Sequence, residues 1–108
     1  MMRLVLALVA LAVAACAYAG DAARGKQKAA QVCAACHGPD GNKPSAPDQP
    51  VLAGQYEDYL VRALSDYKNG RRNNAIMKGF AGQLSKQDIE DLAAWFSIQP
   101  QTALHDQR

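Results

Sequence analysis

Cys33-Ala34-Ala35-Cys36-His37 is the stretch on which the fold of this chain depends. It contains two thiols three positions apart and an imidazole directly after the second, which is the C-x-x-C-H pattern of covalent c-type haem attachment. On a helical turn, residues i and i+3 share a face, so both sulfur atoms can reach the two vinyl groups along one porphyrin edge. The motif therefore predicts one covalently bound haem c, with Cys33 and Cys36 as thioether links and His37 as the proximal iron ligand.

The same two cysteines have two other interpretations. A Cys-x-x-Cys pair can be a redox dithiol or one half of a zinc site. A thioredoxin-like dithiol needs a parallel sheet around it, and the chain has no run of β-branched residues. A zinc site needs four ligands, and only His105 could join the motif without recruiting a carboxylate. Haem attachment is the interpretation that the sequence favours.

The chain length of 108 residues allows one domain, preceded by an export signal. Met1-Met2-Arg3 gives a positive start, residues 4–15 are apolar, and Ala17-Tyr18-Ala19 matches the pattern before a signal-peptidase cut. The apolar run is too short for a transmembrane helix, which needs about 20 residues. We expect residues 1–19 to be a signal peptide and residues 20–108 to be one periplasmic domain with a short polar tail.

Cys16 offers an alternative form of processing. The sequence Val13-Ala14-Ala15-Cys16 also resembles a lipoprotein site, at which the cysteine is lipidated and becomes the first residue. A cut after Ala19 removes Cys16 and leaves no spare thiol in an oxidising compartment, which is the simpler state. We therefore expect the cut after Ala19, with lipidation of Cys16 as the alternative.

Three segments are predicted to be helices, so the expected fold class is all-α. The first begins after Asp21, a good N-cap residue, and ends at Gly38-Pro39. The last begins after Ser85, which forms an S-x-x-D capping box with Asp88, and ends before Pro100. Both carry small or apolar residues at helical spacing.

The middle helix is predicted over residues 55–69. Its apolar stripe consists of Tyr56, Tyr59, Leu60, Ala63, Leu64 and Tyr67. Residues 38–54 contain several prolines and glycines, which indicates a long fixed loop lying over one haem face. Residues 71–84 are expected to form a loop with at most short helical turns.

Met77 is the candidate for the second axial ligand, by elimination. It is the only methionine after the signal segment, and His105, the only other histidine, lies in the polar tail. Given the known pairing of histidine with methionine, Met77 is predicted to complete the coordination of the iron opposite His37. A filled coordination sphere suits an electron carrier and not an enzyme, which must leave a position open for substrate.

With these features the chain resembles the small soluble bacterial class I cytochromes c, with one haem ligated by histidine and methionine. The similarity covers residues 20–99. Beyond the C-x-x-C-H motif it is carried by Pro50-Val51-Leu52-Ala53-Gly54-Gln55, Tyr67-Lys68-Asn69-Gly70-Arg71, Asn74-Ala75-Ile76-Met77 and residues 84–96. The resemblance implies about three main helices wrapped around one haem c.

The resemblance also implies roles for residues outside the motif. In that family the carbonyl of the proline in Pro-x-Leu accepts a hydrogen bond from the proximal histidine, a role that falls to Pro50 here. The first and last helices of the family cross at a small residue against an aromatic one. This implies that Gly25 pairs with Trp95 or Phe96.

The distribution of charge indicates a docking surface more clearly than the formal net charge of +2 does. Residues 67–87 include no acid, and their basic residues are Lys68, Arg71, Arg72, Lys78 and Lys86. The first four are the predicted docking site for acidic redox partners, although ordinary solvated surface charge explains them equally well. Nothing indicates nucleic acid.

The predicted function is therefore periplasmic transfer of single electrons between respiratory proteins. Examples of such partners are a quinol-oxidising complex and a terminal oxidase or reductase. Contact with the membrane is expected only through partners, unless Cys16 is lipidated. The alternatives are a five-coordinate haem enzyme or gas sensor, and a lipid-anchored cytochrome subunit of a larger oxidoreductase.

Overall fold

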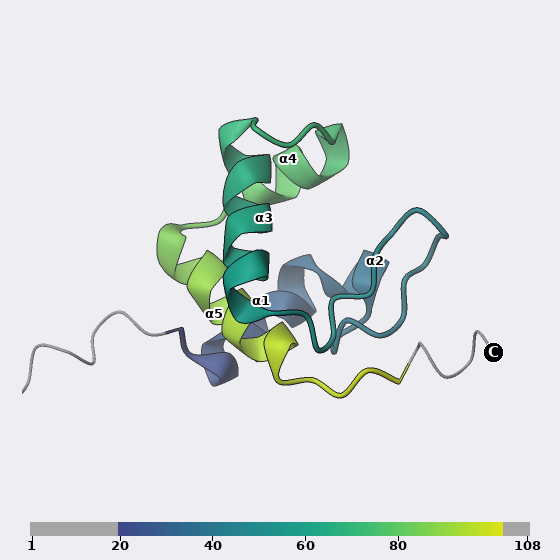
Figure 1. The fold of residues 1–108 in the computed structure, drawn as a ribbon. Helices are drawn as coiled ribbons and strands as arrows, with labels where there is room; N and C mark the ends of the chain where they lie inside the picture. Colours follow the sequence, from purple (N-terminus) through teal and green to yellow (C-terminus); the bar gives the residue numbers. More distant parts are fainter. Residues whose placement is uncertain (1–19, 103–108) are drawn as a thin grey trace, which may run out of the picture.

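A computed structural model describes residues 20–102, and over this range the chain is helical with no β-strand. The helices are α1 (Ala22–Val32), α2 (Ala34–His37), α3 (Glu57–Asn69), α4 (Ala75–Ala81) and α5 (Lys86–Ser97). The three longest, α1, α3 and α5, match the three predicted helices, and the all-α expectation is confirmed (Figure 1).

The expected signal segment, its cut after Ala19, Cys16 and His105 all lie outside the described residues. Among residues 20–102, no helix has the length and apolar character needed to cross a membrane.

The ends of the long helices follow from local chemistry. The Asp21 side chain accepts a hydrogen bond from the backbone N–H of Arg24 at 3.0 Å and so caps α1. At the start of α5, the Ser85 hydroxyl accepts from the Asp88 N–H at 3.0 Å, and the Asp88 carboxylate accepts from the Ser85 N–H at 2.9 Å. This is the predicted capping box, in which each side chain satisfies a backbone donor at the helix end.

The first helix differs from its prediction, because it is broken before Gly38. At Cys33 the backbone φ moves to −105°, which ends α1 and starts the single turn of α2. Gly38 then ends α2 at a φ of +82°, a conformation that residues with a Cβ rarely adopt. The C-x-x-C-H motif therefore lies on a separate short turn and not on the last turn of a continuous helix.

The segment 71–84 also differs from its prediction, because it contains a complete helix. The side chain of Asn74 accepts hydrogen bonds from the N–H groups of Ile76 and Met77, at 3.1 and 3.0 Å, and caps α4. Gly79, a poor helix former, lies within α4 and weakens the helical signal in the sequence. Met77 is thus presented by a helix and not by an irregular loop.

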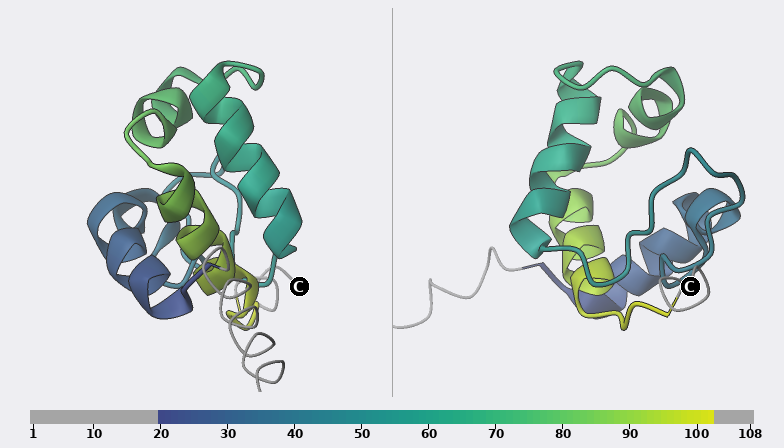
Figure 2. Two further views of the ribbon diagram at one scale, coloured as in Figure 1. Left: turned by 90° about the vertical axis from the view of Figure 1, so that its left-hand side faces the viewer. Right: turned by 45° about the vertical axis from the view of Figure 1, so that its right-hand side comes forward.

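Helix α5 is the centre of the packing, since α1 and α3 both lie against it (Figures 1 and 2). The buried core cluster consists of Ala29, Leu60, Leu84, Ile89, Leu92, Ala93 and Phe96. Most of these residues come from α5, so the apolar stripe predicted for this helix faces the core. The loop over residues 38–56 has no regular structure, as predicted.

The crossing of α1 and α5 occurs at Gly25. A Cβ placed on Gly25 would lie 1.9 Å from the carbonyl oxygen of Asp91 and 2.9 Å from the Cβ of Trp95. The two helix backbones therefore approach more closely than any side chain allows. Of the two predicted aromatic neighbours, Trp95 is the one at the crossing, while Phe96 lies in the core.

A buried carboxylate fastens the start of α1 to the same part of α5. Asp91 accepts hydrogen bonds from the Asp21 N–H at 2.7 Å, from Arg24 Nε at 3.0 Å and from Gln87 Nε2 at 2.8 Å. Burial by itself raises the pKa of Asp91, but these donors outweigh it and hold the pKa below its ordinary value. The carboxylate is therefore charged at neutral pH and fixes the register of the two helices.

The apolar stripe predicted for the middle helix is only partly buried. Leu60 is buried, and Val61 and Leu64 pack against the core, whereas Tyr56 is 79% exposed and Tyr59 47% exposed. Residues 59, 63 and 67 share one face of a helix, next to the face that meets α5. Tyr59 on this face is exposed, whereas Ala63 and Tyr67 are half-buried, so the protein covers this face only in part.

The close crossing of α1 and α5 predicts that a larger residue in place of Gly25 destabilises the protein. Gly25→Ala should lower the free energy of unfolding by about 1–3 kcal/mol or more, because its Cβ overlaps the α5 backbone. Thermal unfolding of the haem-loaded protein measures this change. The control is Gln27→Ala, which puts the same side chain on the exposed side of α1 and should change the stability by less than about 0.5 kcal/mol. Equal stability of the two variants would contradict the close crossing.

Candidate functional site

His37, the last residue of α2, has an imidazole that is oriented by the loop. The residue is only 6% exposed, and its Nδ1 atom lies 3.0 Å from the carbonyl oxygen of Pro50. A carbonyl oxygen can only accept, so Nδ1 carries the proton and donates it to Pro50. The neutral ring then has an unprotonated Nε2, which is the form in which histidine binds a metal. The contact that the resemblance implied for Pro50 is present.

The two cysteines of the motif are free thiols with half-buried side chains. Cys33 packs against the hydrophobic core, and burial raises the pKa of its thiol to about 11. Redox-active dithiols instead have a lowered pKa, because the thiolate is the reactive form. The surroundings of Cys33 therefore disfavour the dithiol interpretation and fit a thiol held beside an apolar surface.

The zinc interpretation has no support within the described residues. Among residues 20–102, no group of three or more histidine, cysteine, aspartate or glutamate side chains is arranged to hold a metal ion. Cys33, Cys36 and His37 need a partner from elsewhere, and the candidate, His105, lies outside this range.

Met77 is held apart from the motif, on α4, which packs against α3. Both α4 and α2 lie on the same side of α3 (Figures 1 and 2). Met77 is half-buried, and the residue before it, Ile76, is 68% exposed. The structure thus supplies two separate sets of candidate ligands on one side of the molecule, one on α2 and one on α4.

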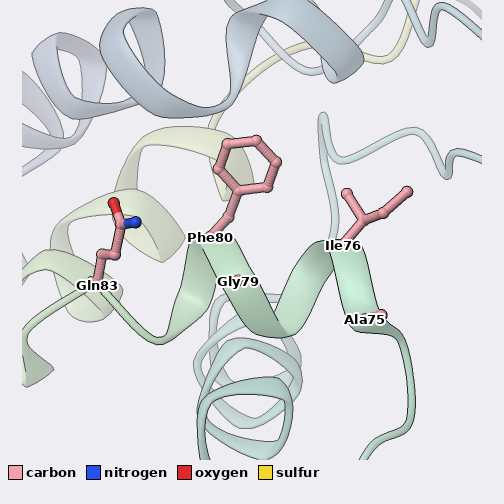
Figure 3. Close-up of a pocket in the computed structure, with 5 residues that line it drawn as sticks. All are labelled: Ala75, Ile76, Gly79, Phe80 and Gln83. Atoms are coloured by element: carbon pink, nitrogen blue, oxygen red, sulfur yellow. The ribbon is translucent and has the colours of Figure 1, made fainter.

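A hollow of about 350 Å³ lies along α4. Its lining consists of Ala75, Ile76, Gly79, Phe80 and Gln83 (Figure 3). The side chains of Ile76, Phe80 and Gln83 project from one side of the helix (Figure 3). Large apolar side chains that are exposed together usually mark a surface covered by another group.

These features together fit a flat apolar macrocycle with a metal at its centre. The motif supplies two thiols and an imidazole whose Nδ1 already faces a carbonyl oxygen. Tyr59 of α3 and the side chains of Ile76 and Phe80 on α4 supply apolar surface that the protein itself leaves exposed. The donor set and the apolar surroundings both match haem c.

The four basic residues predicted as a docking site are all exposed and lie around the junction of α3 and α4. A Cβ placed on Gly70 would lie 3.7 Å from Lys78 Nζ, so the α4 lysine reaches back to the end of α3. Two of the four make internal contacts. Lys68 Nζ donates to the carbonyl oxygen of Leu84, and the guanidinium of Arg72 lies 4.7 Å from the centre of the Tyr67 ring.

The sequence analysis missed two residues that brace the motif from the other side. Trp95 donates a hydrogen bond from Nε1 to the carbonyl oxygen of Pro39 at 3.0 Å, directly after the motif. Asn42 is buried in the following loop and binds the segment after α5. Neither partner is a side chain, so no pairing pattern in the sequence could reveal these contacts.

Comparison with known proteins gives one family throughout. Residues 22–97 match the family model described as "Cytochrome c". The cytochrome c4 of Pseudomonas aeruginosa is 54% identical over 81 residues, covering 75% of this chain and 39% of the relative. The cytochrome c-554(548) of Halomonas halodenitrificans is 45% identical over 84 residues, covering 75% of this chain and 99% of the relative.

A solved structure gives the same result. The crystal structure of reduced recombinant cytochrome c4 from Pseudomonas stutzeri matches with a TM-score of 0.71 and 47% identity, covering 78% of this chain and 48% of that one. This chain therefore spans about half the length, or less, of the cytochrome c4 relatives that it matches. It spans nearly all of the cytochrome c-554(548).

Proposed function

Because this chain belongs to the cytochrome c family and carries covalently bound haem c, we propose that it is a periplasmic electron carrier and not an enzyme. The observation that carries the proposal is the orientation of the His37 imidazole, whose Nδ1 is 3.0 Å from the Pro50 carbonyl oxygen, directly after the two cysteines of the motif. When bound, haem c supplies a couple that takes up and releases one electron at its iron. The protein residues hold and tune that centre.

In this proposal, Cys33 and Cys36 form the two thioether links, and His37 Nε2 is the proximal ligand. The hydrogen bond from Nδ1 to Pro50 fixes the ring orientation and makes the imidazole a stronger donor. Cys33 packs against the hydrophobic core, so its thioether would lie beside apolar side chains. The turn of α2 and the loop over residues 38–56 fix the positions of the residues that have these roles.

Met77 is proposed as the sixth ligand of the iron. It is the only methionine after residue 2, and α4 places it beside the exposed apolar side chains of Ile76 and Phe80. A neutral thioether is a soft ligand, so it favours ferrous over ferric iron and raises the reduction potential. A sphere closed by Met77 has no position for substrate, which is why a carrier is preferred to a five-coordinate enzyme or gas sensor.

Acidic redox proteins are the proposed partners, such as a quinol-oxidising complex and a terminal oxidase or reductase. The basic docking surface consists of Lys68, Arg71, Arg72 and Lys78, and all four are exposed. It surrounds the end of α3 and the helix that presents Met77. A local positive field there steers a weak and fast encounter, which suits a protein that must bind and leave repeatedly.

The proposed location is the periplasm, reached by export and a cut after Ala19. The support is the sequence of residues 1–19, together with the attachment of c-type haem outside the cytoplasm of bacteria. In the structure, the backbone at Gly20 already lies against Glu90, since a Cβ there would be 2.2 Å from the Glu90 carbonyl oxygen. Gly20, the first residue after the proposed cut, is therefore packed against α5.

Replacing Met77 tests the ligand and the function together. The native protein should titrate reversibly with one electron, show the far-red sulfur-to-iron band when ferric, and bind carbon monoxide slowly when reduced. Met77→Ala should lose the band, bind carbon monoxide rapidly and have a lower potential. Asn73→Ala, at an exposed position just before α4, should keep all the native properties. Rapid carbon monoxide binding by the native protein would instead favour the five-coordinate alternative.

Neutralising one lysine tests the docking surface. Lys78→Gln should slow the reaction with an acidic redox protein several-fold at low salt, and the difference should shrink above about 0.15 M salt, where exposed charges are screened. Lys26→Gln on α1 removes the same charge away from α4 and should have little effect. Stopped-flow measurement of both variants checks this, and equal slowing would show that only net charge matters.

The mass of the protein purified from the periplasm tests its processing. We expect a chain that begins at Gly20 and carries the added mass of one haem. A chain that begins at Cys16 with attached lipid would contradict the proposed cut and favour a membrane-anchored subunit.

A further inference from the structure

Asn42 is a buried polar residue in the loop after the haem-binding motif, with an exposed fraction of only 4%. Its side-chain Nδ2 donates to the carbonyl oxygen of Pro100 at 2.9 Å, and its Oδ1 accepts from the N–H of Thr102 at 2.9 Å. Its own backbone N–H donates to Asp40 Oδ1 at 3.0 Å. Both ends of the amide are therefore used to hold the chain that follows α5.

The residues beside Asn42 contact both sides of the hydrogen bond between His37 and Pro50. On the histidine side, the Lys43 N–H donates to the His37 carbonyl oxygen at 3.1 Å. On the proline side, the Gly41 carbonyl oxygen accepts from the N–H groups of Leu52 and Ala53, at 2.9 and 3.3 Å. Residues 41–43 thus connect the backbone of the ligand to the backbone that follows Pro50.

The backbone at Gly41 is tightly packed against its neighbours. Gly41 has a φ of +81°, and a Cβ placed on it would lie 2.9 Å from both Leu52 Cβ and Phe96 Cδ1. The loop backbone is therefore pressed against α5 at this point, and a shift of residues 41–43 must move the neighbouring residues 52–53 as well.

The segment after α5 closes the base of the same loop at a second point. The Gly54 N–H donates to the Phe96 carbonyl oxygen at 2.9 Å, and the side chain of Gln101 lies against Gly54. Figure 1 shows this segment, in yellow, running along the base of the loop. Asn42 holds it at one end of the loop, and Gly54 meets it at the other.

We propose that Asn42 is a positioning residue for the proximal histidine. By fastening residues 100–102 to residues 41–43, it holds the Pro50 carbonyl oxygen on His37 Nδ1. The inference rests on the proposed function, in which His37 Nε2 binds the iron. Breaking the contacts of Asn42 with residues 100–102 leaves the fold in place. It weakens the hydrogen bond from His37 Nδ1 to Pro50, which sets the orientation and donor strength of the imidazole.

The exchange of the His37 Nδ1 proton with solvent, followed by NMR in the reduced haem-loaded protein, measures this hydrogen bond directly. Asn42→Leu keeps about the same volume and adds no charge beside Asp40, but loses the donor to Pro100 and the acceptor for Thr102, so the proton should exchange about tenfold faster or more. The midpoint potential should rise, because a weaker imidazole donor stabilises ferric iron less. Ile89→Val, which removes a methyl group from the core, is the control for a general loss of stability.

A second pair of variants tests the contact between Asn42 and residues 100–102 without changing Asn42. Thr102→Pro removes the N–H that binds Asn42 Oδ1, whereas Thr102→Ala keeps it. The proton should exchange faster in Thr102→Pro and at the native rate in Thr102→Ala.

Two outcomes would overturn the inference: native exchange in both Asn42→Leu and Thr102→Pro, or equal acceleration in Ile89→Val. Failure of the proposed function has a different signature. If His37 is not the ligand, the native protein itself will lack a slowly exchanging Nδ1 proton shifted by the haem ring.

Discussion

The contact of α1 with α5 at Gly25 is the constraint on which the site depends. Helix α1 leads directly into the turn that carries the thiols and His37, so its angle on α5 sets where that turn lies. The approach is close enough that the Asp91 carbonyl oxygen occupies the place of a side chain on Gly25. The Asp91 carboxylate then fixes the register by binding the first turn of α1. The position of the C-x-x-C-H motif is therefore set by the crossing of α1 and α5 at Gly25, which precedes the motif in the sequence.

The predictions that succeeded from residue spacing alone rest on residues close together in the sequence, whereas the Gly25–Trp95 and His37–Pro50 contacts were implied by the family resemblance. The Ser85 capping box, the Asp21 cap and the C-x-x-C-H motif are all local, and so they could be recognised from spacing alone. The break at Cys33 and the helix around Met77 were not predicted, since no proline or glycine marks the break and Gly79 weakens the helical pattern that follows the Asn74 cap. The contacts of Trp95 with Pro39 and of Asn42 with residues 100–102 were missed because their partners are distant backbone groups, which leave no trace in the sequence.

The exposed tyrosines of the predicted middle helix have an explanation of the same kind. The sequence predicts one broad apolar stripe, and the protein leaves Tyr56 and Tyr59 of that stripe exposed. A short chain buries a modest core, so these tyrosines and the apolar side chains of α4 need a further apolar surface to cover them. A haem held by the motif would provide such a surface. The width of the predicted stripe therefore reflects two partners, α5 and the cofactor, and only the first is protein.

The basic residues near α4 differ in what they can offer a partner. Lys68 donates to the Leu84 carbonyl oxygen and Arg72 stacks on Tyr67, so both help to join α3 to the segments that follow it. Their charge still contributes to the field, but moving them would disturb the packing around α4. Arg71 and Lys78 can adapt to an incoming surface at less cost. In the proposed docking site, Arg71 and Lys78 would adjust to a partner, while Lys68 and Arg72 stay in place and add to the steering field.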